Sequence, residues 1–230
     1  MTDTTSKEAS ARLDKFHQEL QELNGKVLAM AELAQQAVSQ SLTALWQRHP
    51  ELARQVIAGD RAINELEEEI DIAVVRVIAL YQPVAVDLRR LMAIDHIIVE
   101  LERLGDLAVN IAEETLELAA LPRREFHPAL PRMAQAAQTM IRQSLTAFTQ
   151  QDVSLARQVC RADDEVDDLD RRIIKELLAD MESSPEAVAF GQSQITIVRS
   201  LERAADHATN IAEQVVFMVE GESVRHRCQD

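Results

Sequence analysis

The chain contains 230 residues, of which 47% are hydrophobic and only 3% are aromatic. Its 39 acidic residues outnumber its 24 basic residues, so the formal net charge is −15. A surface this acidic repels the phosphate backbone of nucleic acids, so we predict no direct nucleic-acid binding.

Helical periodicity dominates the chain from its first apolar residues to its last. Glycine and proline are few, and the strong helix formers Ala, Leu, Glu, Gln and Arg are abundant, so we predict an all-α protein. His49-Pro50 ends one periodic stretch and opens the next, and Gln82-Pro83 does the same further on. We expect six helices, at residues 13–46, 50–80, 84–120, 129–149, 153–182 and 185–220.

Residues 121–128 form the clearest linker, because two prolines and a cluster of charges interrupt the periodicity there. The plan of three helices then repeats, and short connections favour antiparallel neighbours. The sequence therefore predicts two tandem homologous three-helix bundles, at residues 1–120 and 129–221, followed by a tail at 222–230.

No apolar run reaches the length of a membrane span, because the nearest one, residues 70–81, contains Asp71 and Arg76. The N-terminus lacks the apolar core of a signal peptide. We expect a cytoplasmic protein that meets a membrane only through partners. Cys160 and Cys228 lie far apart, so we expect two reduced thiols, with one distant disulfide as the alternative.

The third and sixth helices carry the same oxygen-rich stripe. Residues 101–113 and 201–213 align without a gap, and each segment has an apolar back opposite a polar arc of about 80°. The matched polar residues are Glu102 and Glu202, Asp106 and Asp206, Asn110 and Asn210, and Glu113 and Glu213.

The second and fifth helices carry a second repeated stripe. Residues 60–70 align with residues 163–173, and the apolar positions match. One face presents acidic or amide side chains in both copies. In the first half these are Asp60, Asn64 and Glu67, and in the second half they are Asp163, Asp167 and Asp170.

Carboxylates four residues apart on a helix lie one turn apart, about 5–6 Å between Cβ atoms, and repel each other. A bound cation removes this repulsion, and oxygen-rich ligand sets suit hard divalent ions and iron. A single stripe is more often a solvated helix face. Because the spacing is duplicated, we predict one polycarboxylate metal site in each half.

Some residue roles stay open at this point. Asn110 and Asn210 are either ligands through their carbonyl oxygens or polar surface residues. His207 is either a peripheral ligand or a surface histidine. The Glu-x-x-His element of di-iron bundles, Gly-rich phosphate loops and nucleophile elbows are absent from the sequence, so we expect no enzyme.

The chain resembles the PhoU family of bacterial phosphate regulators over essentially its whole length. The motifs that carry the resemblance are residues 101–106 and 201–213, residues 82–89, and Gly59-Asp60 with the following residues 63–67.

The resemblance implies iron or zinc clusters held by duplicated Glu/Asp-xxx-Asp motifs, with magnesium or manganese in other members. Asn64 departs from the family's carboxylate, and Ala205 stands where the first copy has Gly105. The motif positions in this chain are Glu102, Asp106, Glu202, Asp206, Asp60, Asn64, Asp163 and Asp167, with Asn110, Asn210, Glu67, Asp170, Glu113 and Glu213 as further candidates.

The resemblance also implies a function. Such proteins link a high-affinity phosphate ABC transporter, through its ATPase component, to a sensor histidine kinase, and they are expected to form homodimers. They repress the phosphate-starvation response and restrain uptake when phosphate is plentiful. Two rival hypotheses are a metal-dependent hydrolase of phosphate compounds and a structural helical protein without metal. Whether this chain is the main regulator or a paralogue stays open.

Overall fold

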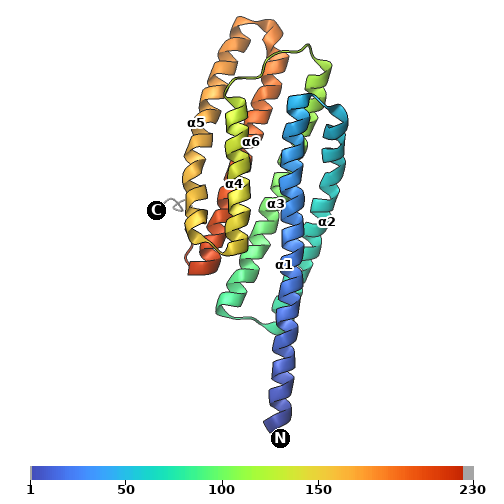
Figure 1. Ribbon diagram of the computed structural model, residues 1–230, viewed down its shortest axis with the longest axis vertical. Coiled ribbons are helices and arrows are strands. Elements are labelled where there is room, and N and C mark those ends of the chain that lie inside the picture. Colours follow the sequence, from blue (N-terminus) through green and yellow to red (C-terminus); the bar gives the residue numbers. More distant parts are fainter. Residues whose placement is uncertain (1, 225–230) are drawn as a thin grey trace.

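The computed structural model describes residues 2–224, and the side chains of residues 12–224. It contains no strand in that part of the chain, and its helices form two bundles of three (Figure 1). The prediction of an all-α protein built from two tandem three-helix bundles is therefore confirmed. The elements are α1 (Thr2–Gln47), α2 (Pro50–Tyr81), α3 (Ala85–Ala120), α4 (Leu130–Gln150), α5 (Val153–Ser183), a 3₁₀ turn (Pro185–Ala187) and α6 (Val188–Glu220).

Local chemistry sets the helix ends. The His49 side chain caps α2 by accepting a hydrogen bond from the backbone N–H of Leu52 (3.1 Å), and Pro50 follows in the first turn. Asp152 caps α5 in the same way, accepting from Leu155 (2.9 Å). The first helix begins well before the predicted residue 13, since residues 2–12 contain no glycine or proline to stop a helix that is already formed. Residues 225–230 of the predicted tail lie outside the described residues.

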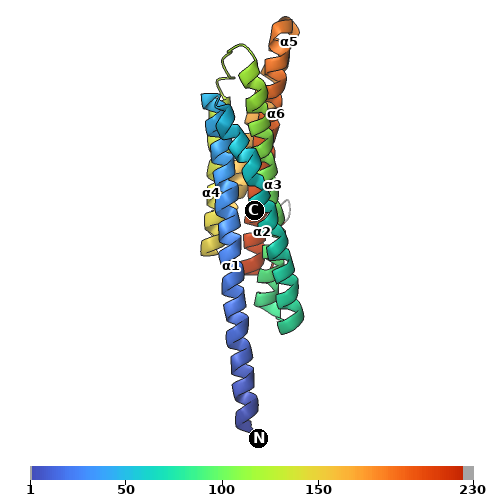
Figure 2. The same cartoon turned by 90° about the vertical axis from the view of Figure 1, so that its right-hand side faces the viewer.

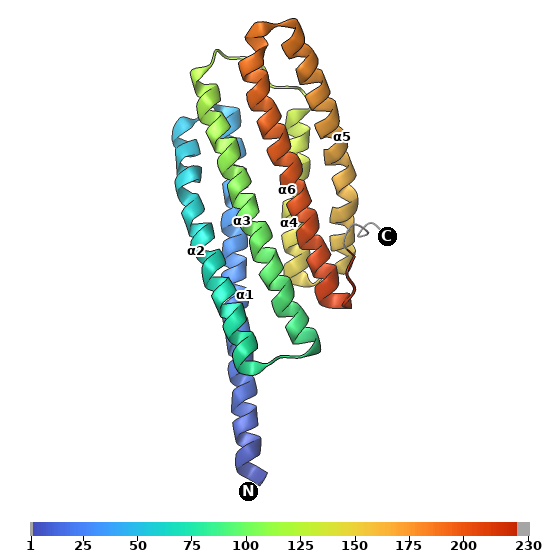
Figure 3. The same ribbon diagram turned by 180° about the vertical axis from the view of Figure 1, so that it is seen from behind.

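The two bundles lie side by side, and α3 and α6 form their central antiparallel pair. Figure 3 shows these two helices at the front, with α2 and α5 on the outside. Figure 2 shows α1 and α4 together in the layer behind them. The N-terminal part of α1 extends beyond the other helices (Figure 1). The chain thus folds with an approximate two-fold relation between its halves.

One continuous core runs through both bundles. The apolar back predicted for the third helix is buried, since Leu101, Leu104, Ala108 and Ile111 are at most 1% exposed. Each large side chain buried in this way contributes about 1.5–3 kcal/mol. None of the helices within residues 2–224 is both long enough and apolar enough to cross a membrane.

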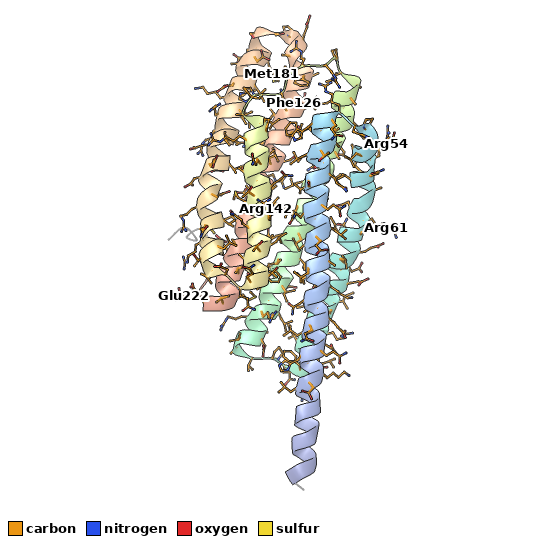
Figure 4. The ribbon with its side chains drawn as sticks, in the orientation of Figure 1. Arg54, Arg61, Phe126, Arg142, Met181 and Glu222 are labelled. Atoms are coloured by element: carbon orange, nitrogen blue, oxygen red, sulfur yellow. The ribbon has the colours of Figure 1, made fainter. Side chains whose placement is uncertain are left out.

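The linker is packed between the bundles. The Phe126 ring contacts Trp46 edge to face (5.4 Å between centroids) and Phe190 (5.5 Å), and Figure 4 shows it near the end of α4 where the halves meet. The buried His127 contacts Glu176 through Nε2 (2.9 Å). The linker therefore fixes the halves relative to each other.

Cys160 takes part in a disulfide bond, and no free cysteine is found among the described residues. The expectation of a reduced thiol at this position is therefore wrong. The alternative given for it, a disulfide, is the one that holds. The other cysteine, Cys228, lies outside the described residues.

A pair of matched isoleucine substitutions tests the core. Ile98→Ala on α3 removes a side chain that is 1% exposed, so we expect a loss of about 2–5 kcal/mol in unfolding free energy. Ile72→Ala on α2 removes one that is 61% exposed, and we expect a change within about 0.5 kcal/mol. Urea denaturation measures both, and equal losses would contradict this account of the packing.

Candidate functional site

The first acidic cluster forms where α2 packs against α3. Gly105 permits this close approach, because a Cβ atom there would lie 2.8 Å from Asp60 Oδ1 and 3.0 Å from Ile63 Cδ1. Asn64 donates a hydrogen bond from Nδ2 to Asp60 Oδ2 (3.0 Å). The other oxygen, Asp60 Oδ1, is buried without a hydrogen-bond partner. A buried acceptor left in this state costs free energy that a cation or donor would recover.

Four carboxylates make up this first cluster: Asp60, Glu67, Glu102 and Asp106. Burial raises the pKa of Asp60, of Glu67 and of Glu102, and the charge of Asp106 raises each of them further. Arg103 partly compensates, since it lies 3.4 Å from both Glu102 Oε2 and Asp106 Oδ2. The predicted stripes of α2 and α3 therefore face each other and repel.

The second acidic cluster forms where α5 packs against α6, and it consists of Asp163, Asp167, Asp170, Glu202 and Asp206. Burial raises the pKa of Asp163 to about 7, and the charges of Asp206 and Asp167 add to the shift. Burial likewise raises the pKa of Glu202, with Asp206 as the next cause, and that of Asp206, with Asp167 as the next cause. This cluster has a fifth carboxylate, Asp167, where the first cluster has the amide of Asn64.

Asp170 is the most buried acid of the second cluster, at 4% exposure. Its Oδ2 accepts a hydrogen bond from Arg199 Nη1 (2.9 Å), while its Oδ1 is buried without a partner. Burial raises the pKa of Asp170, and Arg199 opposes the shift. Both clusters thus contain one carboxylate oxygen that no group among the described residues satisfies.

Asn210 and His207 lie at the contact between the two halves. Glu100 of α3 contacts His207 Nδ1 (2.6 Å) and accepts a hydrogen bond from Asn210 Nδ2 (3.1 Å), both through Oε2. Sequence reasoning missed this bridge. The sequence feature that could have indicated it is that both partners break the internal repeat. Glu100 aligns with Ser200, and His207 aligns with Leu107.

The remaining candidates are less involved in the clusters. Asn110 is half-buried, and Glu113 is exposed on α3. Glu213 lines a small cavity between α3 and α6 together with His96 and Phe217. The structure therefore brings the predicted residues of the two stripes together in the two acidic clusters. The candidates farther along α3 and α6, at positions 110, 113, 210 and 213, lie outside these clusters.

As the described side chains stand, no group of three or more His, Cys, Asp or Glu residues is arranged to hold a metal ion. The donor set nevertheless suits a cation, because it consists of carboxylate and amide oxygens and includes the unsatisfied Asp60 Oδ1 and Asp170 Oδ1. Holding a cation would require the carboxylates of a cluster to rotate towards a common point. The residues therefore have donor atoms that suit a metal ion, but their side chains are not arranged to coordinate one in this structure.

These features define a class of protein: a duplicated three-helix bundle with one acidic cluster in each repeat. The family model described as PhoU domain matches residues 27–115 and 130–215. The chain belongs to the PhoU family, which confirms the resemblance predicted from the sequence.

Relatives match over nearly the whole chain. A "Phosphate-specific transport system accessory protein PhoU homolog" of Aquifex aeolicus is 39% identical over 93% of this chain and 96% of the relative. The "Phosphate-specific transport system accessory protein PhoU" of Escherichia coli is 32% identical over 92% of this chain and 88% of the relative. The crystal structure of PhoU from Pseudomonas aeruginosa matches 90% of this chain and 100% of that one, with 34% identity and a TM-score of 0.87. The regulatory protein PhoU from Streptococcus pneumoniae has a TM-score of 0.84 at 30% identity, over 91% of this chain and 99% of that one.

The raised pKa of Asp163 predicts a pH-dependent stability in the presence of chelator. The pKa of Asp163 is about 7 in the folded chain and 3.8 ordinarily. Between these two pH values the folded state therefore keeps a proton that the unfolded chain has lost. Stability from this group is full below pH 3.8 and declines as the pH rises to about 7. Asp163→Asn removes this loss, so its melting temperature should exceed the wild-type value by more at pH 8 than at pH 5.

Asp180→Asn, an exposed change on the same helix, is the matched control and should show no such pH-dependent gain. Scanning calorimetry at the two pH values makes the comparison. An equal effect of Asp163→Asn at both pH values would show that this carboxylate is not strained by burial and neighbouring charge.

Proposed function

We propose that this chain is an accessory regulator of phosphate uptake. The observation that carries the proposal is the match to relatives named as phosphate-specific transport system accessory proteins, which spans more than nine-tenths of this chain. Its finer content is that the protein represses the phosphate-starvation response and restrains the phosphate ABC transporter when phosphate is plentiful.

The mechanism we propose is binding without catalysis. In the cytoplasm, the protein acts as a homodimer that contacts the ATPase component of the transporter and a sensor histidine kinase of the phosphate regulon. Contact with each partner biases that partner's activity, and the membrane is reached only through them. The long helices support this role, since they offer extended side surfaces for partners on a rigid body (Figure 1).

We further propose that each acidic cluster binds metal, as an iron or zinc cluster in the first instance and magnesium or manganese otherwise. Glu102 and Asp106 with Asp60 and Asn64 would hold it in the first half. Glu202 and Asp206 with Asp163 and Asp167 would hold it in the second half. Support comes from the unsatisfied buried oxygens and from the mutual raising of carboxylate pKa values. Bound metal would neutralise charge between packed helices and thereby link metal supply to stability.

Metal content tests the proposed sites directly. The protein is purified without chelator or nickel and compared, by mass spectrometry of the metals, with a four-fold variant. We expect stoichiometric iron, zinc or manganese in the wild type and its loss in the variant, because the ligands have gone. The variant carries Glu102→Gln, Asp106→Asn, Glu202→Gln and Asp206→Asn.

A matched control removes the same number of charges from outside the clusters. It carries Asp14→Asn, Glu117→Gln, Asp180→Asn and Glu182→Gln, all at exposed positions. Metal retained in the control and lost in the four-fold variant supports the sites. Equal metal content in all three proteins would place any metal elsewhere.

Regulation is tested in a bacterium whose own phosphate accessory protein has been deleted. Expressing this chain there should restore repression of a phosphate-starvation reporter in high phosphate, since the chain would again link transporter and kinase. Reporter activity in high and in low phosphate is the readout. Unchanged reporter activity, despite soluble chain in the cells, would contradict the proposal.

A further inference from the structure

The two repeats differ in the groove beside each acidic cluster. In the second half, α5 and α6 enclose a groove of about 510 Å³. Its lining mixes charged side chains, including Lys175 and Arg171 from α5 and Arg199 from α6, with the apolar Ile174, Leu178 and Ala179.

Three of the corresponding positions in the first half carry exposed apolar side chains, whereas others, such as Asp71 and Arg76, are charged. The repeat alignment that pairs Asp60 with Asp163 and Glu102 with Glu202 also pairs three further positions. Ile72 aligns with Lys175, Val75 with Leu178 and Val99 with Arg199. Their exposed fractions are 61%, 60% and 42%, respectively. We call these three residues, Ile72, Val75 and Val99, the α2–α3 patch.

The fold does not require apolar residues at these positions. The second half has the same helices with Lys and Arg at two of the three. Valine and isoleucine also have lower helix propensity than Lys or Arg, so an exposed helix position gains nothing from them locally. Ile72 and Val75 lie one turn apart on α2, and the counterparts of all three residues line a single groove in the second half. Apolar side chains exposed together in this way are typical of an interaction site.

Acidic residues surround the patch. Glu68 and Asp71 stand one helical turn before Ile72 and Val75 on α2, and Asp95 stands one turn before Val99 on α3. Two arginines stand one turn after patch residues, and both are directed to acids: Arg76 lies 3.2 Å from Glu19 of α1, and Arg103 lies 3.4 Å from both Glu102 and Asp106. The surface therefore presents an apolar centre with a negative rim.

We propose that the α2–α3 patch docks an amphipathic helix of a partner protein, with apolar residues on its inner face and Lys or Arg beside them. This rests on the proposed function, which needs a protein partner, and it names the surface and the chemistry of that partner. A partner helix with apolar anchors at i, i+3 and i+4 presents one apolar face, which suits exposed apolar side chains on two packed helices. A second copy meeting face to face would place one acidic rim against another, and an anionic membrane would be repelled by the net charge of −15.

The test uses a synthetic amphipathic helix with Leu on one face and Lys on the other, labelled for fluorescence anisotropy, and a Leu/Glu helix for comparison. The patch variant carries Ile72→Gln, Val75→Gln and Val99→Gln. The control variant carries Leu178→Gln, Val188→Gln and Val219→Gln, which are similarly exposed positions of the second half (47%, 41% and 40%). Circular dichroism checks that both variants fold.

We expect the wild type and the control variant to bind the Leu/Lys helix with similar affinity. The patch variant should bind it with an affinity lower by about tenfold or more, and no protein should bind the Leu/Glu helix. Equal binding by patch and control variants overturns the proposal, as does no binding by the wild type. A dimer that the patch variant alone loses, in sedimentation, assigns the patch to a second copy instead. If the wild type binds anionic lipid vesicles and the patch variant does not, the patch belongs to a membrane contact. Either of these two results also overturns the proposal.

The proposed function fails separately from this inference. Helix binding that depends on the patch, in a chain that does not restore the starvation reporter, leaves the surface standing and removes the phosphate role. If the wild type and the patch variant both restore repression of the reporter, the phosphate role stands and the patch has no part in it.

Discussion

Repulsion between carboxylates on packed helices is the constraint on which the rest of this structure depends. Both repeats partly bury acidic stripes where two helices meet, α2 with α3 and α5 with α6, and this burial raises the pKa of several of these acids. Partial burial weakens the screening by water that normally makes such stripes harmless. The protein offsets part of the cost with Arg103 and Arg199, and leaves one buried oxygen unsatisfied in each cluster. The metal proposed for each cluster would remove this repulsion.

Most of the fold followed from the sequence because helices leave strong local signals. Periodic apolar residues and the proline breaks at Pro50 and Pro83 located the helices within a few residues, apart from the start of α1. The stripes were visible for the same reason, since a four-residue spacing fixes which side chains share a face. The facing of the two stripes within each repeat came from the structure, through the approach of Asp60 to Gly105.

Contacts between the halves were beyond the sequence. The bridge from Glu100 to His207 and Asn210 joins residues more than a hundred positions apart, and nothing in either helix alone sets that register. The disulfide of Cys160 stood only as the alternative to reduced thiols, because the spacing of two cysteines does not decide whether they pair. Departures from the internal repeat were the one signal that pointed to such features. Val99 against Arg199 and Glu100 against Ser200 are neighbouring departures in the alignment of α3 with α6.

The two repeats have therefore kept the acidic clusters and diverged around them. Under the two proposals made above, the shared clusters would hold the same kind of ligand twice, and the different surfaces beside them would give the two halves different roles in partner binding. The most direct test of the central claim is the anomalous scattering of a metal-loaded crystal, recorded at the absorption edge of the bound metal. The account predicts anomalous peaks between α2 and α3 and between α5 and α6, within bonding distance of Glu102, Asp106, Glu202 and Asp206. Peaks only at other positions, or none in a crystal grown with the metal, would contradict it.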